Sequence, residues 1–205
     1  MLRQVSQFVV RPTVDELKSL WLFAYARSSL YEAMEWLDLL PKLPAGSALE
    51  RAVICAAVVA YVRPFSECRV RPKEKIVPLK GVAPPDDLAG NHQDAIDLRN
   101  KMIGHKDATP AERHSSTPNM VLAHVENAHV AFHTTMIGGM DDSVRLALKN
   151  LCLFFIAHCE KYMKPITKVL APEIRRKYQP GIYELVISEA PNEWIKPFKP
   201  PASAA

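Results

Sequence analysis

One short stretch of the sequence combines residue types that are suited to phosphate chemistry. In DLRNKMIGHKD, Arg99 is followed directly by Asn100, and His105 stands six positions after the arginine. Arginine stays charged at physiological pH and matches phosphate oxygens with two parallel donors. Histidine exchanges protons near neutral pH, since its unperturbed pKa is about 6.5. The three residues therefore form either a catalytic group or merely the polar end of a surface helix.

The composition is that of an ordinary globular protein. The chain has 205 residues, 48% of them hydrophobic and 23% charged, and a formal net charge of +4 that permits contact with nucleic acid without requiring it. The apolar runs at 52–62 and 151–157 are shorter than the roughly 20 residues that cross a bilayer. The four cysteines include no Cys-x-x-Cys pair, and nothing in their contexts requires an oxidising compartment. We therefore expect a cytoplasmic protein that makes no membrane contact.

Four helices are predicted, and capping signals mark where the first two begin. Thr13 with Glu16, and Ser47 with Glu50, have the spacing of a capping box, in which each side chain satisfies a free amide at the helix start. The fourth helix is expected to begin at Asp142 or Ser143. The predicted helices span 13–40, 47–62, 91–104 and 142–163.

Apolar residues at helical spacing indicate which side chains of the first and fourth helices face the core. Pro41, Pro64 and Pro165 are expected to stop the first, second and fourth helices, because proline lacks the amide that continues a helix. The expected core positions are Leu17, Leu20, Trp21, Ala24, Tyr31 and Met34 in the first helix and Leu146, Leu151, Phe154, Phe155 and Tyr162 in the fourth.

The third predicted helix carries the arginine. It is expected to begin near Asn91, an N-cap residue type, and to end at Gly104, a natural C-terminal residue. Ile96, Arg99 and Ile103 lie three and four residues apart, so they share one stripe of the helix. The stem of Arg99 should therefore lie along apolar surface.

Two segments between the helices have their own patterns. Residues 64–90 contain five prolines and five basic residues, which indicates a long irregular connection with one short extended piece near 75–79. Residues 119–137 alternate apolar and polar side chains, and Glu126 with the following asparagine could form a turn. We interpret this segment as a β-hairpin, and a helix is the competing interpretation.

The last part of the chain, 164–205, holds seven prolines and one candidate strand at 182–188. We interpret it as an extended Pro-rich C-terminal tail that follows a helical domain over 1–163. The expected fold is mainly α: an up-and-down four-helix bundle with a small β-hairpin inserted at about 119–137.

In these features the sequence resembles the HEPN superfamily, whose members are up-and-down four-helix bundles. Its nuclease members carry an arginine, then a polar residue, then a histidine four to six residues beyond the arginine. Arg99, Asn100 and His105 match this motif, and the predicted helices resemble the family's bundle over roughly 13–163. The specific part of the resemblance is seven residues long.

The resemblance implies a metal-independent endoribonuclease that acts as a toxin or a defence component. RNA can be cleaved by attack of its own 2′-hydroxyl on the adjacent phosphorus, which leaves a 2′,3′-cyclic phosphate and needs no cofactor. His105 would act as acid and base, and Arg99 would stabilise the charge on the phosphate. Asn100 would orient either the scissile phosphate or the arginine.

The spacing of the motif also bears on partners. Six residues along a helix correspond to about 600°, so Arg99 and His105 do not share a face of a regular helix. One histidine also cannot easily serve as base and acid in a single step. The family solves both problems by dimerising, so the resemblance implies a homodimer with the site at its two-fold interface. The expected partners are RNA, a second copy of the chain, and an antitoxin or other protein.

Other interpretations of the motif stay open. Many HEPN domains bind nucleotides or partners without cleaving anything, so the alternative function is a non-catalytic helical module for dimerisation or partner binding. Arg99 could instead pair with Asp97, Glu35 or a helix end. His105 could simply lie at the C-terminal end of a helix and interact favourably with the helix dipole.

A second group of histidines raises the question of a metal site. His124, His129 and His133 lie close together in the predicted hairpin, and imidazoles are common zinc ligands. Beyond Glu126, no cysteine or third carboxylate stands at ligand spacing. Polar positions on one face of a hairpin explain the three histidines better, and we expect no metal.

Overall fold

The structure, a computed structural model, describes residues 12–71, 74–100, 121–126, 129–134, 139–185, 187 and 195–197. These residues are mainly helical, with small two-stranded antiparallel sheets. The chain divides into a central unit, Ala26–Ala157, and a terminal unit made of Met1–Tyr25 with His158–Ala205. None of the described helices combines the length and the apolar character that crossing a membrane requires.

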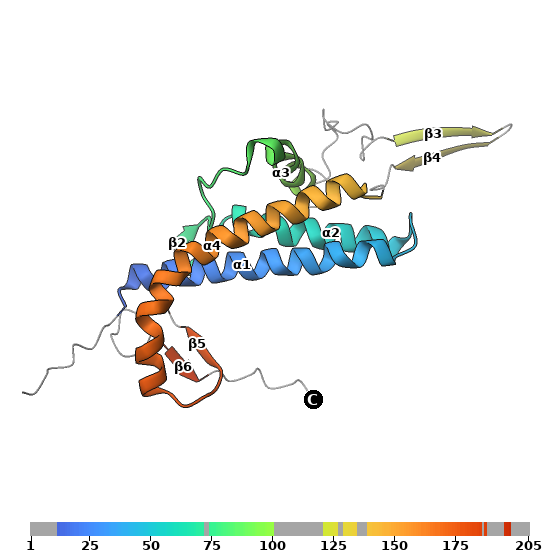
Figure 1. The fold of residues 1–205 in the computed structure, drawn as a ribbon. Coiled ribbons are helices and arrows are strands. Elements are labelled where there is room, and N and C mark those ends of the chain that lie inside the picture. The colour runs from blue at the N-terminus through green and yellow to red at the C-terminus, as the bar shows by residue number, and fades with distance from the viewer. Residues whose placement is uncertain are drawn as a thin grey trace, which may run out of the picture. The chain divides into compact units, whose positions relative to one another are not determined.

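The helices are α1 (Val14–Leu39), α2 (Ala48–Val62), α3 (Ala89–Asp97) and α4 (Asp142–Lys177) (Figure 1). Three 3₁₀ turns accompany them: η1 (Leu40–Lys42), η2 (Arg63–Phe65) and η3 (Asp86–Leu88). The strands pair antiparallel as β1 (Cys68–Arg71) with β2 (Glu74–Ile76), β3 (Val121–Glu126) with β4 (His129–Thr134), and β5 (Tyr183–Leu185) with β6 (Ile195–Pro197).

The first predicted capping box is complete and the second is present in part, and their bonds explain where α1 and α2 begin. The Glu16 amide donates to Thr13 Oγ1 at 3.1 Å, and the Thr13 amide donates to the Glu16 carboxylate at 2.8 Å. The Glu50 amide donates to Ser47 Oγ at 3.0 Å. The Glu50 carboxylate accepts from the amide of Gly46, at 2.5 Å, rather than from Ser47. Gly46 has a φ of 73°, which favours glycine.

Proline ends the first two helices as predicted, but it does not end the fourth. Pro41 and Pro64 each lie in a 3₁₀ turn that closes the preceding helix. The predicted end of the fourth helix before Pro165 was wrong, because α4 continues to Lys177 with Pro165 and Pro172 inside it. Both internal prolines are exposed, so the carbonyls that lose an amide partner can bond to water.

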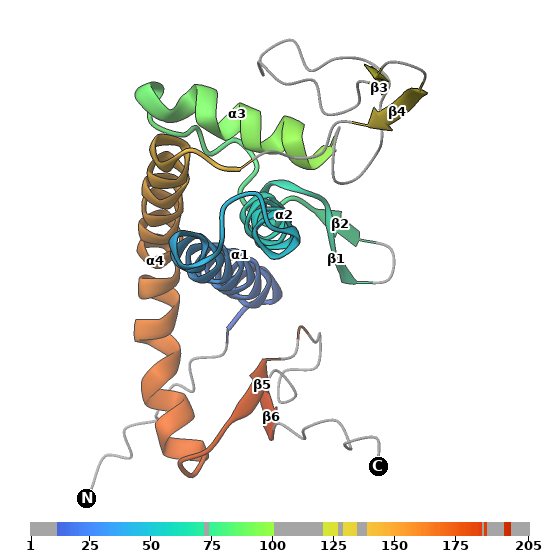
Figure 2. The ribbon, with the colours of Figure 1, turned by 90° about the vertical axis from the view of Figure 1, so that its right-hand side faces the viewer.

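The core of the central unit forms between α1, α2 and the part of α4 before residue 158. Figures 1 and 2 show these three stretches running alongside one another, with α3 lying across them. Each contributes side chains that are at most 2% exposed: Leu30 and Leu37 from α1, Ile54 and Val58 from α2, and Leu151 and Phe155 from α4.

The buried faces of α1 and α4 differ in part from the predicted ones. Leu17, Leu151 and Phe155 are buried as expected. Other predicted core residues are exposed instead: Tyr31 by 44%, Leu146 by 51%, Phe154 by 39% and Tyr162 by 48%. Where apolar residues occur on several sides of a helix, the neighbouring helices decide which side is buried, and the local pattern does not contain that information.

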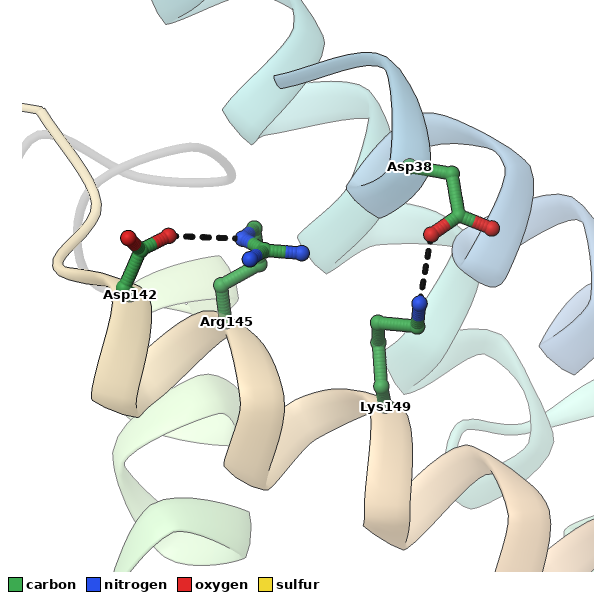
Figure 3. Close-up of polar contacts among 4 residues, drawn as sticks. All are labelled: Asp38, Asp142, Arg145 and Lys149. Atoms are coloured by element: carbon green, nitrogen blue, oxygen red, sulfur yellow. Dashed lines mark hydrogen bonds and ion pairs between the residues drawn. The ribbon is translucent and has the colours of Figure 1, made fainter. Parts of the chain in front are cut away.

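An ion pair joins α4 to the end of α1 within the central unit (Figure 3). Lys149 Nζ lies 2.5 Å from Asp38 Oδ1, and the lysine side chain is 25% exposed. One turn earlier in α4, Arg145 Nε donates to Asp142 Oδ1 at 3.0 Å. Lys149 and Asp38 are 111 residues apart in sequence, so their contact helps to set which turn of α4 lies beside α1.

The connection between α2 and α3 is more ordered than predicted. The expectation of an irregular segment over 64–90 was wrong in part, because β1 and β2 form a hairpin there in which Cys68 is paired with Ile76. Only β2 overlaps the expected extended piece. After the hairpin, the Leu79 amide donates to the Pro64 carbonyl at 3.0 Å, and Leu79 is 2% exposed. Burial of this side chain ties the connection to the core.

The predicted hairpin over 119–137 is confirmed as β3 and β4, with Glu126 paired to His129. In the terminal unit, β5 falls inside the candidate strand at 182–188. The expectation of an extended tail there was wrong in part, since the second half of α4 and both C-terminal strands pack around a small core. That core consists of Leu17 and Leu170, with Leu20, Ile166, Ile174, Leu185 and Ile195 packed against it.

Candidate functional site

The helix that carries the predicted site is anchored by a hydrogen bond and by aromatic packing. The Tyr61 hydroxyl on α2 lies 2.7 Å from His92 Nδ1 on α3, and Tyr61 is fully buried. The rings of Phe65 and Phe155 lie 4.6 Å and 5.6 Å from the His92 ring, measured between centroids. One turn further along α3, Ala95 is 4% exposed. These contacts fix the position of α3 within the central unit.

Burial disfavours the charged forms of both Tyr61 and His92. It raises the pKa of the Tyr61 hydroxyl and lowers the pKa of the His92 imidazole. The hydrogen of a fully buried hydroxyl needs an acceptor, so we assign Tyr61 as the donor to Nδ1 and place the His92 proton on Nε2. The sequence did not single out either residue, because their contact joins positions 31 residues apart.

The predicted site begins where α3 changes its geometry. Residues 98–100 continue the helix as a π-helical turn, which is a feature often found at functional sites. The start of α3 also differs from the prediction. Leu88, the last residue of η3, is the N-cap residue, so α3 begins two residues before Asn91 and the expected N-cap at Asn91 was wrong. Arg99 and Asn100 both lie in the π-helical turn.

The structure brings Arg99 and Asn100 into contact. Arg99 is half-buried, and its Nη1 donates to Asn100 Oδ1 at 2.9 Å, while Asn100 is exposed. The contact places the amide oxygen of Asn100 against the guanidinium of Arg99. Asp97 accepts instead from Gln93 Nε2 at 2.9 Å. Among the residues that the structure describes, neither Asp97 nor Glu35 pairs with Arg99.

The third predicted site residue, His105, lies outside the described residues, as do Ile103 and Gly104. Asp94 is a residue of this region that the sequence pattern gave no reason to single out, since an acid near a helix start is common. Its Oδ1 atom is buried and has no hydrogen-bond partner among the described atoms. An unpaired buried carboxylate oxygen is costly, so this atom is available to accept a hydrogen bond near the start of the π-helical turn.

Within the described part of the chain, no group of three or more His, Cys, Asp or Glu side chains comes together as a metal site. The histidines of the predicted cluster, His124, His129 and His133, lie on β3 and β4, where the structure describes the backbone pairing. None of the four cysteines, all of which the structure describes, forms a disulfide. Burial raises the pKa of the Cys152 thiol to about 12, so this thiol stays protonated and is not a nucleophile.

Comparisons with protein-family models, with curated proteins and with solved structures each find no match. The candidate site consists of the residues that follow the anchored α3 helix, where the Asn100 side chain accepts a hydrogen bond from the half-buried guanidinium of Arg99.

Proposed function

We propose that the chain is a metal-independent endoribonuclease of the HEPN type that acts as a toxin or defence component. The observation that carries the proposal is the contact between Arg99 and Asn100 at the end of α3. A guanidinium has five N–H donors, and this contact uses one of them. The remaining donors suit the oxygens of a phosphate.

The proposed reaction needs one base, one acid and one cation. The 2′-hydroxyl of the RNA attacks the adjacent phosphorus, and His105 takes its proton. The bond from phosphorus to the 5′-oxygen breaks, and this oxygen takes a proton from His105 of a second copy. Arg99 stabilises the charge on the phosphate oxygens, oriented by Asn100. The products are a 2′,3′-cyclic phosphate and a 5′-hydroxyl, and no cofactor takes part.

One feature of the fold agrees with a HEPN-type bundle, and one departs from it. The chain supplies four helices, as the bundle requires, and the β3–β4 hairpin lies between the third and the fourth of them. The departure is α3, which lies across its neighbours rather than alongside them (Figure 2). In this proposal α3 holds Arg99 in position for the phosphate.

Incubation of RNA with the protein in EDTA tests the proposal. The expected products end in a 2′,3′-cyclic phosphate, and Arg99→Ala and His105→Ala should each abolish cleavage while leaving the circular dichroism spectrum unchanged. Arg69→Ala, at an exposed arginine of β1, is the matched control and should cleave normally. Intact RNA under all conditions, or equal cleavage by the three variants, would defeat the proposal.

A specific observation favours the alternative, a non-catalytic HEPN-like module that dimerises. Leu146, Leu153 and Phe154 are 51%, 51% and 39% exposed on the part of α4 that belongs to the central unit. Exposed apolar side chains that gather on one element mark interaction surfaces. If this function is the right one, Leu153→Lys should convert a dimer to a monomer in light scattering, and His105→Ala should change no measured property.

A further inference from the structure

The second half of α4, within the terminal unit, carries a row of exposed basic side chains. At 100° per residue, the four positions fall within about 60° of one another around the helix, and they extend over about 21 Å of its length. We call this row the basic ridge. It consists of Lys161, Lys164, Lys168 and Arg175.

The basic ridge lies on the side of α4 that faces away from the core of the terminal unit. Ile166, Leu170 and Ile174, on the opposite side of the helix, pack with Leu17. An amphipathic helix that inserts into a membrane surface needs a free apolar face. The apolar face of this segment is already occupied, which argues against a lipid surface as the partner.

No acid neutralises the ridge along its own length. Between its first and last residue, Glu173 is the only acid, and it pairs with Arg176 and Lys177 at 3.0 Å each. None of the four ridge side chains forms an ion pair with another described residue. Lys164 lies three residues from Lys161 and four from Lys168, and like charges at these spacings destabilise a helix. A bound anion would relieve this repulsion.

An aromatic side chain lies beside one end of the ridge. Tyr162, next to Lys161, is 48% exposed. Its ring stacks on Phe23, with centroids 5.2 Å apart, and lies 4.7 Å from the ring of His158. The Tyr162 ring is therefore held in place while half of its surface stays open to solvent.

We propose that the basic ridge binds the phosphate backbone of a single-stranded nucleic acid, with Tyr162 stacking on one base. Proteins that bind single strands combine a line of positive charge with exposed aromatic rings. The spacing of the charges along one line fits an extended polyanion. The ridge belongs to the terminal unit and Arg99 to the central unit, so the two are tested by different variants, and binding here does not depend on whether the chain cleaves RNA.

A labelled single-stranded oligodeoxynucleotide provides the test, by fluorescence anisotropy at several salt concentrations. It has no 2′-hydroxyl, so the proposed cleavage cannot occur and only binding is measured. Four phosphate contacts predict a slope of log K against log salt of about −2.8. Replacing two ridge charges, in Lys164→Gln/Lys168→Gln, should bring the slope to about −1.4 and weaken binding about 60-fold at about 50 mM salt. Glutamine matches lysine in helix propensity, so α4 should be preserved.

The matched control is Lys75→Gln/Lys80→Gln, which makes the same change in net charge at exposed lysines of the central unit. It should bind like the wild type. Tyr162→Leu should weaken binding about tenfold without changing the salt slope. Three results would overturn the proposal: no binding by the wild type at about 50 mM salt, equal weakening in the control, or ridge-dependent binding to anionic vesicles without binding to the oligonucleotide.

Discussion

Replacing Tyr61 by phenylalanine removes one hydroxyl group from the contact between α2 and α3 and leaves the ring that fills the core. That hydroxyl lies 2.7 Å from His92 Nδ1 in a fully buried position. Its loss leaves Nδ1 without a donor, and a buried polar atom without a partner costs about 1–3 kcal/mol. His92 is only half-buried, so water reaches part of its ring. We therefore expect the free energy of unfolding to fall by about 1–1.5 kcal/mol.

The stability of this contact should also depend on pH. Burial lowers the pKa of His92 below its ordinary value of about 6.5, so the unfolded chain binds the proton at a higher pH than the folded chain. The contribution of neutral His92 to the free energy of unfolding is therefore fully present above about pH 6.5, and it is lost as the pH falls toward the pKa of His92 in the folded chain. The pKa of His158 is lowered too, by burial and by Lys161, and it acts in the same direction. The contribution of His92 to the loss of stability in acid is therefore the difference between the loss measured for the wild type and the loss measured for His92→Gln.

Urea unfolding followed by circular dichroism, at about pH 8 and about pH 5.5, measures both effects. Tyr31→Phe is the matched control, because Tyr31 is 44% exposed, and it should change stability by less than about 0.5 kcal/mol. Acid should destabilise His92→Gln less than it destabilises the wild type. Wild-type stability in Tyr61→Phe at about pH 8, or undiminished acid sensitivity in His92→Gln, would refute the reasoning.

Three further predictions concern folding and reactivity. Ser47→Ala should lower the free energy of unfolding by about 1 kcal/mol in urea titration, because the Glu50 amide loses its acceptor; an unchanged midpoint would contradict this. Phe155→Ala should cost about 3–5 kcal/mol, whereas Phe154→Ala, at a side chain that is 39% exposed, should cost far less, and equal losses would show that the burial argument is wrong. Thiol titration of the native protein should leave Cys152 unmodified until unfolding, and its early reaction would contradict the burial that raises its pKa to about 12.

The starts of helices could be predicted because the signals are local. Thr13 and Ser47 bond to groups three residues away, so the spacing in the sequence is enough to identify them. The β3–β4 hairpin was predictable for the same reason, since its pairing begins between Glu126 and His129, which are three residues apart. The end of α4 was not predictable from Pro165, because the packing of Leu170 against Leu17 stabilises the part of the helix that follows this proline.

The candidate site also combines features that could be predicted from the sequence with features that only the folded structure contains. The sequence alone could pair Arg99 with Asn100, since the two residues are neighbours, and it could supply the chemistry that arginine and histidine offer. The hydrogen bond between Tyr61 and His92, which anchors α3, joins positions 31 residues apart, so no local pattern contains it.

The sequence by itself thus determined that the protein is mainly helical, where α1, α2 and α4 begin, and which residues could act on a phosphate. Only the tertiary structure decided which sides of α1 and α4 are buried, how far α4 continues, and that the four basic residues of the ridge share one exposed line. The physical reason is the separation along the sequence over which each interaction acts. Capping bonds and turns act within a few residues, whereas burial is set by side chains that are distant in sequence and meet only in the folded chain.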